Sequence, residues 1–467
     1  MEGVHRQIKN DASSLKRMAR RFMEFSLDYS RYFVVRGKDI SGHARSYLSG
    51  LLGTQRRKNI GRIGEDVEAS NYQGMQQLIS DSPWDHEALM DQVAGEANGL
   101  LGGHRHSALY LDETSFVKKG DASVGVQRQY CGRLGKLENC QVGVFGCLGR
   151  EERAALVDAR LFLPEEWSKD AGRCAKTKVP EAERVHRTKG ELALLIVERA
   201  RQRGLSFQWV GGDEIYGNNK PLTDALEDMG ETFLMDVNSN HGLYEEDPCP
   251  RAKAQRPGLR GRPVCRLEPG NARAAHCSAS ELVKRYFEAE SRPVTIRQSA
   301  KGILRARLLV RRCWQWDGKS PEARVRLLVA RQEADGTFKY SLTNAPESTD
   351  WEQLAYMQAQ RFWIERAFQD AKSELGMAQY EVRSWRGWHH HIALVCLAML
   401  FVLKERLLAT EHTPLLSARD IVELLAFYLP RRNRNEDQIF QSMQLRHNQR
   451  ARDIAMRRTK RKPVVTK

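Results

Sequence analysis

The sequence predicts a mixed α/β fold in which a sheet-bearing core carries a β-rich insertion and has helical regions at both ends. Three observations support this. Apolar segments joined by glycine-containing turns lie between residues 107 and 148, and apolar segments alternate with helical ones between residues 184 and 237. A continuous apolar run extends from Ile392 to Leu403. A membrane helix needs roughly 20 apolar residues, so this shorter run predicts a buried helix in a soluble protein.

Composition and charge set further limits. The chain has 467 residues, of which 41% are hydrophobic and 29% charged, and this composition suits a folded protein of about two to four units. The formal net charge of +16 favours a polyanionic partner over a merely solvated basic surface. Nine cysteines without a Cys-x-x-Cys pair argue against a disulfide framework and a zinc ribbon, and indicate reduced thiols in the cytoplasm.

The first region, residues 1–105, is expected to be helical. The pattern predicts short helices over Arg56–Val67 and Tyr72–Ser80, and a third that begins near Asp85. The first of these begins with three cations, Arg56, Arg57 and Lys58. The three helices could therefore form a DNA-reading unit, and the alternative of a plain helical subdomain is equally open.

Residues 106–237 are expected to form the first part of the core. Ser107–Asp112 is an apolar strand that ends in an acid, and candidate strands follow over Ser123–Tyr130 and Glu138–Leu148. The turn Gly132–Gly135 lies between the last two. Strands joined by glycine-containing turns indicate an antiparallel meander.

Strands then alternate with helices in the same region. The expected elements are a helix over Arg184–Arg203 that Gly204 ends, an apolar strand over Phe207–Asp213, a helix over Asn219–Met229 and a strand over Thr232–Val237. The full order is strand, strand, strand, helix, strand, helix, strand. This is the element order of the ribonuclease H fold and predicts a mixed sheet.

Residues 238–345 interrupt this pattern and are expected to form the β-rich insertion. The segment Arg256–Pro263 is basic and rich in turns, and strands are predicted over Arg305–Trp316, Val325–Arg331 and Phe338–Thr343. Residues 346–410 then supply the helical last part of the core. Residues 411–467 form a tail in which Pro430–Lys467 holds twelve Lys and Arg against three Asp and Glu.

Two acids end apolar strands in the predicted core. Asp112 follows Ala108–Leu111, and Asp213 follows Phe207–Gly212. Burying a carboxylate in such a place is costly unless it is paired or bound to a cation. A glutamate follows each aspartate, but successive strand residues point to opposite faces, so we select the aspartate in both pairs.

A third acid lies on the helix predicted over Arg361–Lys372. At about 100° per residue, Arg361 and Lys372 lie near the same side of the helix as Glu365. Taken alone, this stripe also fits an exposed, salt-bridged helix, which is common.

Together the three acids predict a metal site. Carboxylates that converge at one sheet edge repel each other, and divalent cations with oxygen ligands relieve that repulsion. A pair of Mg²⁺ ions can activate an attacking water or 3′-hydroxyl and stabilise the leaving oxygen at a phosphate. Arg361 and Lys372 would then contact DNA phosphates near the scissile bond.

Three blocks of the sequence resemble a known family, the bacterial insertion-sequence transposases of the DDE type. The first block comprises Leu111–Gly120, Gln129–Gly132 and Glu138–Val144, and the second is Gly212–Gly217. The third runs from Arg361 to Lys372 and on through Leu375–Gly376, Tyr380–Arg383 and Trp385–His391. The branch that the chain resembles is the insertion-sequence-701 group of the four-like superfamily.

The resemblance implies a ribonuclease H-like core with a β-rich insertion between the second and third acids. It implies catalysis by Asp112, Asp213 and Glu365 with two Mg²⁺ or Mn²⁺ ions. The implied reaction is cut-and-paste transposition, with cleavage at terminal inverted repeats of double-stranded DNA and strand transfer into a target. A homodimer that joins two transposon ends, acting at the bacterial nucleoid, is also implied. One position departs from the superfamily signature: its tyrosine is Gln358 here, and the nearby Tyr356 lies on the opposite helix face.

Other signals are weaker. The triplets His104–His106 and His389–His391 could suggest metal sites, but neighbouring helical histidines rarely share one ion, so we expect structural roles. Trp314 and Trp316 in the insertion are expected to pack within strands more readily than to stack on an unpaired base. Two other functions fit the same acids: a DNA nuclease of this fold that does not join strands, and an inactive DNA-binding relic or repressor.

Overall fold

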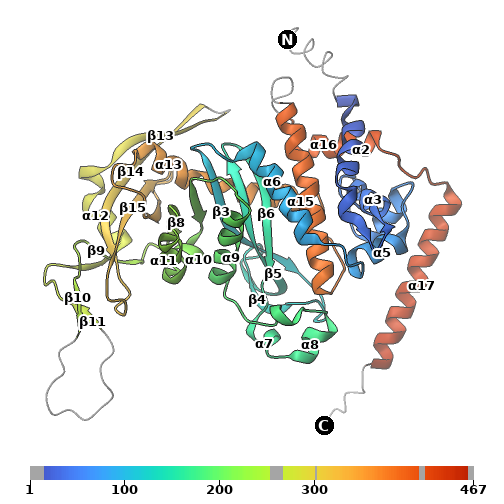
Figure 1. Cartoon of the computed structure of the whole chain (residues 1–467), viewed down its shortest axis with the longest axis horizontal. Helices are drawn as coiled ribbons and strands as arrows, with labels where there is room; N and C mark the ends of the chain where they lie inside the picture. Colours follow the sequence, from blue (N-terminus) through green and yellow to red (C-terminus); the bar gives the residue numbers. More distant parts are fainter. Residues whose placement is uncertain (1–14, 253–266, 300–301, 410–415, 461–467) are drawn as a thin grey trace, which may run out of the picture.

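A computed structural model describes residues 15–252, 267–299, 302–409 and 416–460. Figure 1 shows a central sheet, with the insertion at one end of the molecule (yellow) and the N- and C-terminal helices (blue and red) at the other. The basic segment expected at Arg256–Pro263 lies outside the described residues, and so does the last part of the basic tail. None of the helices in the described ranges is long and apolar enough to cross a membrane.

The core sheet has the predicted ribonuclease H-like order. Its five strands lie in the order β6–β5–β3–β7–β8. The central strand β3 pairs antiparallel with β5 and parallel with β7, and β7 pairs parallel with β8. The bounds are β3 (Ser107–Val117), β5 (Lys136–Arg150), β6 (Arg153–Leu161), β7 (Trp209–Gly212) and β8 (Phe233–Val237). This arrangement confirms the mixed α/β fold class.

The antiparallel part of the sheet differs in detail from the prediction. The expected middle strand is the short edge strand β4 (Gln127–Cys131), which pairs with the beginning of β5. The third meander strand is β6, which was not predicted. It follows a hairpin at Glu151, where a non-glycine residue has φ 54° and so gives no glycine signal.

Helices connect the strands where the pattern predicted them. A capping box at Thr188 begins α9 (Lys189–Gln202), and Gly204, with φ 73°, follows its end. The short helix α10 (Glu214–Gly217) follows β7 directly, and α11 (Lys220–Asp228) leads towards β8. The apolar run Ile392–Leu403 lies in α15 (Trp385–Leu408) and is buried along its whole length, as expected for a core helix.

The main strands of the insertion extend the core sheet, whereas β10 and β11 pair with each other as a separate two-stranded sheet. Strand β16 pairs antiparallel with β8, and β15 and β14 continue outward from it. The helix α12 and strand β13 were not predicted. The elements are β9 (Gly242–Tyr244), β10 (Pro250–Ala252), β11 (Leu267–Pro269), β12 (His276–Ser278), α12 (Ala279–Glu290), β13 (Arg292–Ser299), β14 (Gly302–Gln315), β15 (Arg324–Gln332) and β16 (Phe338–Thr343).

The N-terminal region is helical, as predicted, and packs on α15 through α3, α5 and α6. Asp85 caps α6 by accepting hydrogen bonds from two backbone N–H groups of its first turn. The elements are α2 (Met18–Asp28), η1 (Ser30–Phe33), β1 (Val34–Val35), β2 (Lys38–Asp39), α3 (Ser41–Leu51), α4 (Ile60–Asp66), α5 (Tyr72–Ser80) and α6 (His86–Leu101).

The remaining helices complete the core and the tail. Two small helices, α7 (Glu165–Ser168) and α8 (Ala171–Lys176), and the turn η2 (Glu181–Glu183) lie between β6 and α9. The helical region after the insertion is divided at Arg361, which separates α13 (Trp351–Gln360) from α14 (Phe362–Ser373). The chain then ends in α15, α16 (Ala418–Tyr428) and the long α17 (Glu436–Lys460).

Candidate active site

The first two predicted acids are neighbours across two parallel strands. Strands β3 and β7 pair with Leu111 opposite Gly212, so the next residue of each chain segment, Asp112 and Asp213, lies at the same level of the sheet. Asp112 is inside β3 and not at its end, because the strand continues to Val117. Asp213 follows β7 and caps α10, where its Oδ1 accepts a hydrogen bond of 2.9 Å from the N–H of Ile215.

The third acid faces the same cavity from a helix. Glu365 lies in the first turn of α14, with 48% of its side chain exposed. The cavity has a volume of about 900 Å³ and is lined by all three acids together with Glu113, Thr114, Ser115, Tyr130, Gly132, Arg133, Ile215, Arg361, Phe368, Gln369, Lys372, Ser373, Ala378 and Gln379. Residues that are far apart in the sequence therefore meet here, as the sequence predicted.

Arg361 connects the acids. Its guanidinium lies 2.8 Å from Glu365 Oε1 and 3.8 Å from Asp112 Oδ2. Its Nε lies 3.2 Å from Asp236 Oδ2, at the end of β8. Sequence analysis placed Arg361 near Glu365 but missed Asp236. A single cation thus neutralises part of a cluster of four carboxylates, Asp213 included.

The electrostatics of the cluster favour a bound cation. Burial, reinforced by the charge of Asp213, raises the pKa of Asp112 well above its usual value. Burial, followed by the charge of Glu113, raises the pKa of Asp213 to about 6, although Arg361 opposes both shifts. Raised pKa values mean that the ionised carboxylates are under-compensated by the protein alone.

Glu113 has its own partners. One carboxylate oxygen lies 2.7 Å from Lys189 Nζ, and the other accepts a hydrogen bond of 2.9 Å from the hydroxyl of Tyr216. Asp112, in contrast, has Arg361 beside it. The expectation that Glu113 points away from the site is wrong, because Glu113 lines the same cavity as Asp112 and its charge raises the pKa of Asp213.

Lys372, in the last turn of α14, also lines the cavity. Its ammonium donates a hydrogen bond to Thr114 Oγ1 on β3. Burial, followed by the nearby Arg133, lowers the pKa of Lys372 to about 8. A desolvated ammonium beside the acids is suited to a phosphate oxygen, which would stabilise its charged form.

The residues present fit divalent cations of the Mg²⁺ type. The donors that converge are carboxylate oxygens, which hard cations prefer, and the cavity leaves space for waters and phosphate oxygens. Asp112, Asp213 and Glu365 would hold such ions, because their charge exceeds what Arg361 neutralises.

The three cations proposed for DNA binding in the N-terminal region have different environments. Arg56 and Arg57 lie exposed in the loop between α3 and α4. Lys58 is buried, and its ammonium donates to the carbonyl oxygens of Leu51, at 2.8 Å, and Glu374. Burial lowers its pKa to about 8. The sequence prediction for Lys58 therefore needs correction, because this side chain fastens the loop to α14 and does not face DNA.

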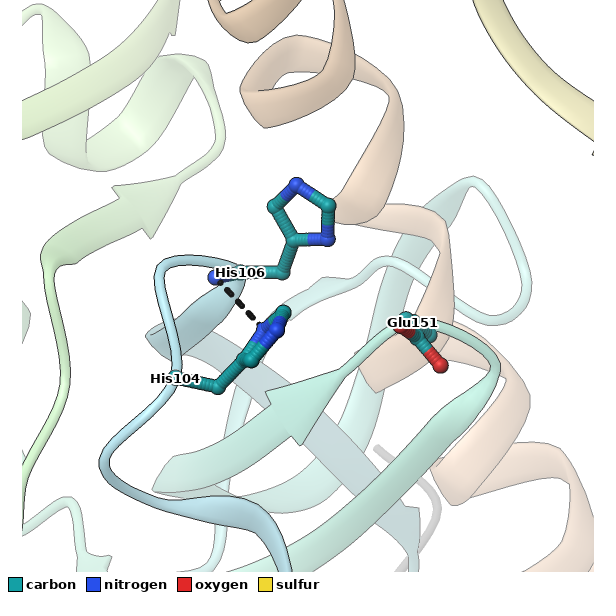
Figure 2. Close-up of side chains that lie close together, drawn as sticks. All are labelled: His104, His106 and Glu151. Carbon is teal, nitrogen blue, oxygen red and sulfur yellow. Dashed lines mark hydrogen bonds between the residues drawn. The ribbon is translucent and has the colours of Figure 1, made fainter.

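The histidine pair near the start of β3 lies apart from the acid cluster. Figure 2 shows His104 and His106 from the loop before β3 close to Glu151 from the β5–β6 turn, with one candidate ligand atom of each within 4.8 Å of the others. His104 Nδ1 already accepts a hydrogen bond from the N–H of His106, at 3.2 Å. This cluster lies at the opposite end of β3 from the acid-lined cavity.

The other minor signals have structural roles. The three consecutive histidines of α15 are buried; His390 faces the carbonyl oxygens of Ile79 and Trp84, and burial lowers its pKa to about 3. Trp316 is buried and its indole N–H donates to the carbonyl of Ser320. In both groups these polar side-chain atoms therefore bind backbone carbonyls of the protein.

Comparison with known proteins identifies the family. Residues 35–302, more than half of the chain, match the family model of the DDE superfamily endonucleases. This range contains Asp112 and Asp213 and ends before Glu365. The chain is also similar to a probable transposase for insertion sequence element IS701 from Microchaete diplosiphon, with 28% identity over 224 residues. That alignment covers 47% of this chain and 55% of the relative's length. The chain therefore belongs to the DDE superfamily of endonucleases.

Proposed function

We propose that the protein is a transposase that cuts double-stranded DNA at transposon ends and joins the cut ends to a target. The observation that carries the proposal is the meeting of Asp112, Asp213 and Glu365 around Arg361 in one cavity. Three acids that share one neutralising arginine suit a metal-dependent reaction at a phosphate. Similarity to a probable insertion-sequence transposase supports the same reaction class.

The proposed reaction has two balanced steps at phosphorus. Hydrolysis breaks the bond between phosphorus and a 3′ oxygen, which leaves as a 3′-hydroxyl. This hydroxyl then attacks a target phosphate and displaces a second 3′ oxygen, so one phosphodiester replaces another. Two Mg²⁺ or Mn²⁺ ions, when bound, would activate the attacking oxygen and stabilise the leaving one.

Five residues of the cavity have a proposed task in these steps. Asp112 and Asp213 offer rigid carboxylates from the sheet, whereas Glu365 offers a half-exposed one from α14. Lys372 contacts a phosphate oxygen from the Thr114 side of the cavity. Arg361 provides a second positive charge and remains anchored by Asp236. Arg56 and Arg57 contact DNA outside the cavity, and two chains pair to hold two ends.

Conservative substitutions test the assignment. Asp112→Asn and Glu365→Gln remove a charge while they keep the shape of the side chain, so we expect loss of Mg²⁺-dependent cleavage of inverted-repeat DNA. Binding of the same DNA in EDTA should survive, because these acids do not contribute positive charge. Glu352→Gln, at an exposed acid of the first turn of α13, provides the matched control. Full cleavage by either active-site variant would refute the proposal.

A nuclease that cuts without joining is the main rival. Precut transposon ends with free 3′-hydroxyls, incubated with supercoiled target DNA and Mn²⁺, separate the two functions. Joined products support the transposase, and cleavage of uncut ends without joining of precut ends supports the nuclease. DNA binding without cleavage under any metal condition would indicate an inactive relic.

A further inference from the structure

Two segments from opposite ends of the chain form one basic groove. The loop between α3 and α4 supplies Arg56 and Arg57, and the C-terminal segment supplies cations before and along α17. The groove has a volume of about 610 Å³ and is lined by six arginines and two acids, together with Gln55: Arg56, Arg57, Arg62, Arg432, Arg434, Arg450, Glu65 and Asp66. Such an excess of positive charge in a concave surface fits a polyanion.

Glu65 of α4 assembles this groove. Its carboxylate accepts from Arg62 at 2.8 Å, from Arg434 at 3.3 Å and from Arg446 of α17 at 2.6 Å. One acid thus holds three guanidinium groups, two of which come from the far end of the chain. In Figure 1, α17 extends beside the N-terminal helices. Glu65 therefore joins the beginning of α17 to α4.

Further contacts fix the segment that leads into α17. Arg431 pairs with Asp66 at 2.9 Å, and the Arg432 guanidinium donates to the carbonyl oxygen of Ser70 at 2.7 Å. These two arginines are occupied by the protein. In contrast, Arg56, Arg57 and Arg450 are exposed, and within the described ranges no ion pair involves them. Their charges are available to an external anion.

The loop that supplies Arg56 and Arg57 to the groove also contacts the wall of the active-site cavity. The backbone N–H of Lys58 donates to Gln379 Oε1 at 2.6 Å, and Gln379 lines that cavity. The Lys58 ammonium also binds the carbonyl of Glu374, just after α14. The loop that carries Arg56 and Arg57 is thus fixed to the end of the helix that carries Glu365.

We propose that this groove binds the phosphate backbone of double-stranded DNA beside the cleavage cavity, and that Glu65 is the positioning residue that assembles it. The choice of DNA as the polyanion rests on the proposed function. The assembly of the groove by Glu65 rests on the three ion pairs alone. An acid in a DNA-binding groove would normally repel phosphates, so its presence needs a structural reason, and the arginines that it holds supply one.

One substitution distinguishes two roles of Glu65: holding the arginines of the groove in place, or only repelling DNA phosphates. Glu65→Gln removes a negative charge from the groove, so electrostatics alone predict tighter DNA binding. If Glu65 assembles the groove, α17 loosens and the dissociation constant for a 30-base-pair fluorescent duplex rises about fivefold, which corresponds to about 1 kcal/mol. The assay uses the full chain in EDTA, where no cleavage occurs. Glu68→Gln, the same charge change at an exposed acid nearby, is the matched control and should leave binding unchanged or slightly tighter.

Variants of the exposed arginines test DNA binding by the groove even if Glu65→Gln perturbs folding. Arg56→Gln combined with Arg57→Gln alters two exposed side chains and should reduce the slope of log affinity against log salt concentration by about 1.8, because each phosphate contact contributes about 0.9. Arg450→Gln alone should reduce it by about 0.9.

Two results would overturn the inference. Binding by Glu65→Gln that equals or exceeds wild-type binding would show that Glu65 does not assemble the groove. An unchanged salt slope in the arginine variants would show that the groove does not contact DNA. Because these measurements omit metal, they remain separate from the cleavage test: a protein that binds through the groove but never cleaves would refute the transposase alone.

Discussion

Replacing Asp213 by asparagine should stabilise the metal-free protein at neutral pH. The carboxylate is half-buried near Glu113 and Asp236, and its pKa is raised from 3.8 to about 6. Asparagine removes the charge and still accepts the hydrogen bond from the N–H of Ile215 that caps α10, since Asn and Asp serve equally well at this position. The substitution therefore isolates the electrostatic cost of the acid.

The sign and size of the effect follow from the raised pKa. Below pH 3.8 Asp213 is protonated in both the folded and the unfolded chain, so the wild type and the Asp213→Asn variant should be equally stable. Between about pH 4 and 6 the unfolded chain ionises first and the wild type loses stability; above pH 6 the loss is complete. A shift of about two pH units corresponds to at most about 3 kcal/mol, and partial exposure to solvent reduces this to about 1–2 kcal/mol.

Thermal unfolding in EDTA at pH 7.5 and pH 4 measures this prediction. At pH 7.5 the variant should melt about 1–2 °C higher than the wild type, because the unfolding entropy of a chain of 467 residues is large, and at pH 4 the difference should shrink. Saturating Mg²⁺ should raise the wild-type melting temperature alone; about 100-fold excess over the dissociation constant stabilises by about 2.7 kcal/mol. Asp121→Asn, at an exposed aspartate, controls for the general loss of an acid. A variant that melts at or below the wild-type temperature at pH 7.5 without metal would refute the electrostatic reasoning.

Three further tests concern other parts of the structure. His104→Ala combined with His106→Ala should leave Mn²⁺-dependent cleavage within about twofold of wild type, and a large loss would connect that cluster to the active site. Lys58→Met removes two hydrogen bonds to buried carbonyls and should lower the free energy of unfolding by about 2–3 kcal/mol in a urea titration; an unchanged midpoint would contradict its fastening role. Tyr130 lines the active-site cavity with 58% of its surface exposed, so Tyr130→Ala should weaken binding of precut ends by about 1 kcal/mol through lost base stacking, whereas Tyr130→Phe should not. Equal losses in both Tyr130 variants would exclude stacking.

The core strands that could be predicted were those with strong local signals. The segments around β3, β7 and β8 are short apolar runs bounded by glycine or acids, and their order fixed the fold class. Strand β6 gave no such signal, because alanines at 154, 155 and 159 have weak strand propensity and a charged Asp158 interrupts the run. Its pairing with β5 is a tertiary effect that local pattern does not encode.

In the insertion, too, the strands could be predicted from the local pattern but their pairing with the core could not. Its strands β14, β15 and β16 were predicted from β-branched and aromatic runs, and the Asp335–Gly336 turn between β15 and β16 has Gly336 at φ 84°. That β16 would pair with β8 depends on the register Leu342 opposite Met235, which joins residues more than one hundred positions apart. The local pattern therefore predicts a separate β-rich insertion, whereas in the structure its strands continue the core sheet.

The acids of the site could be predicted, but the network that holds them could not. Strand ends and helical spacing drew attention to Asp112, Asp213 and Glu365. Asp236 is the last residue but one of β8, and no motif of the sequence pointed to it. Its importance depends on Arg361, which reaches across from the α13–α14 junction.

The hydrogen bonds around Asp236 explain how the chain uses Gln358, which stands where the superfamily signature has a tyrosine. Gln358 lies seven residues before Glu365, but the turn at Arg361 separates the two helices, so spacing along one continuous helix does not decide which way its side chain faces. The side chain is buried and donates to Ser341 Oγ at 2.9 Å, and Ser341 in turn donates to Asp236 at 2.7 Å. A tyrosine at this position would lose the amide donor that supports this chain of hydrogen bonds. Glutamine therefore contributes to the site indirectly, because it orders the carboxylate that anchors Arg361 between the acids.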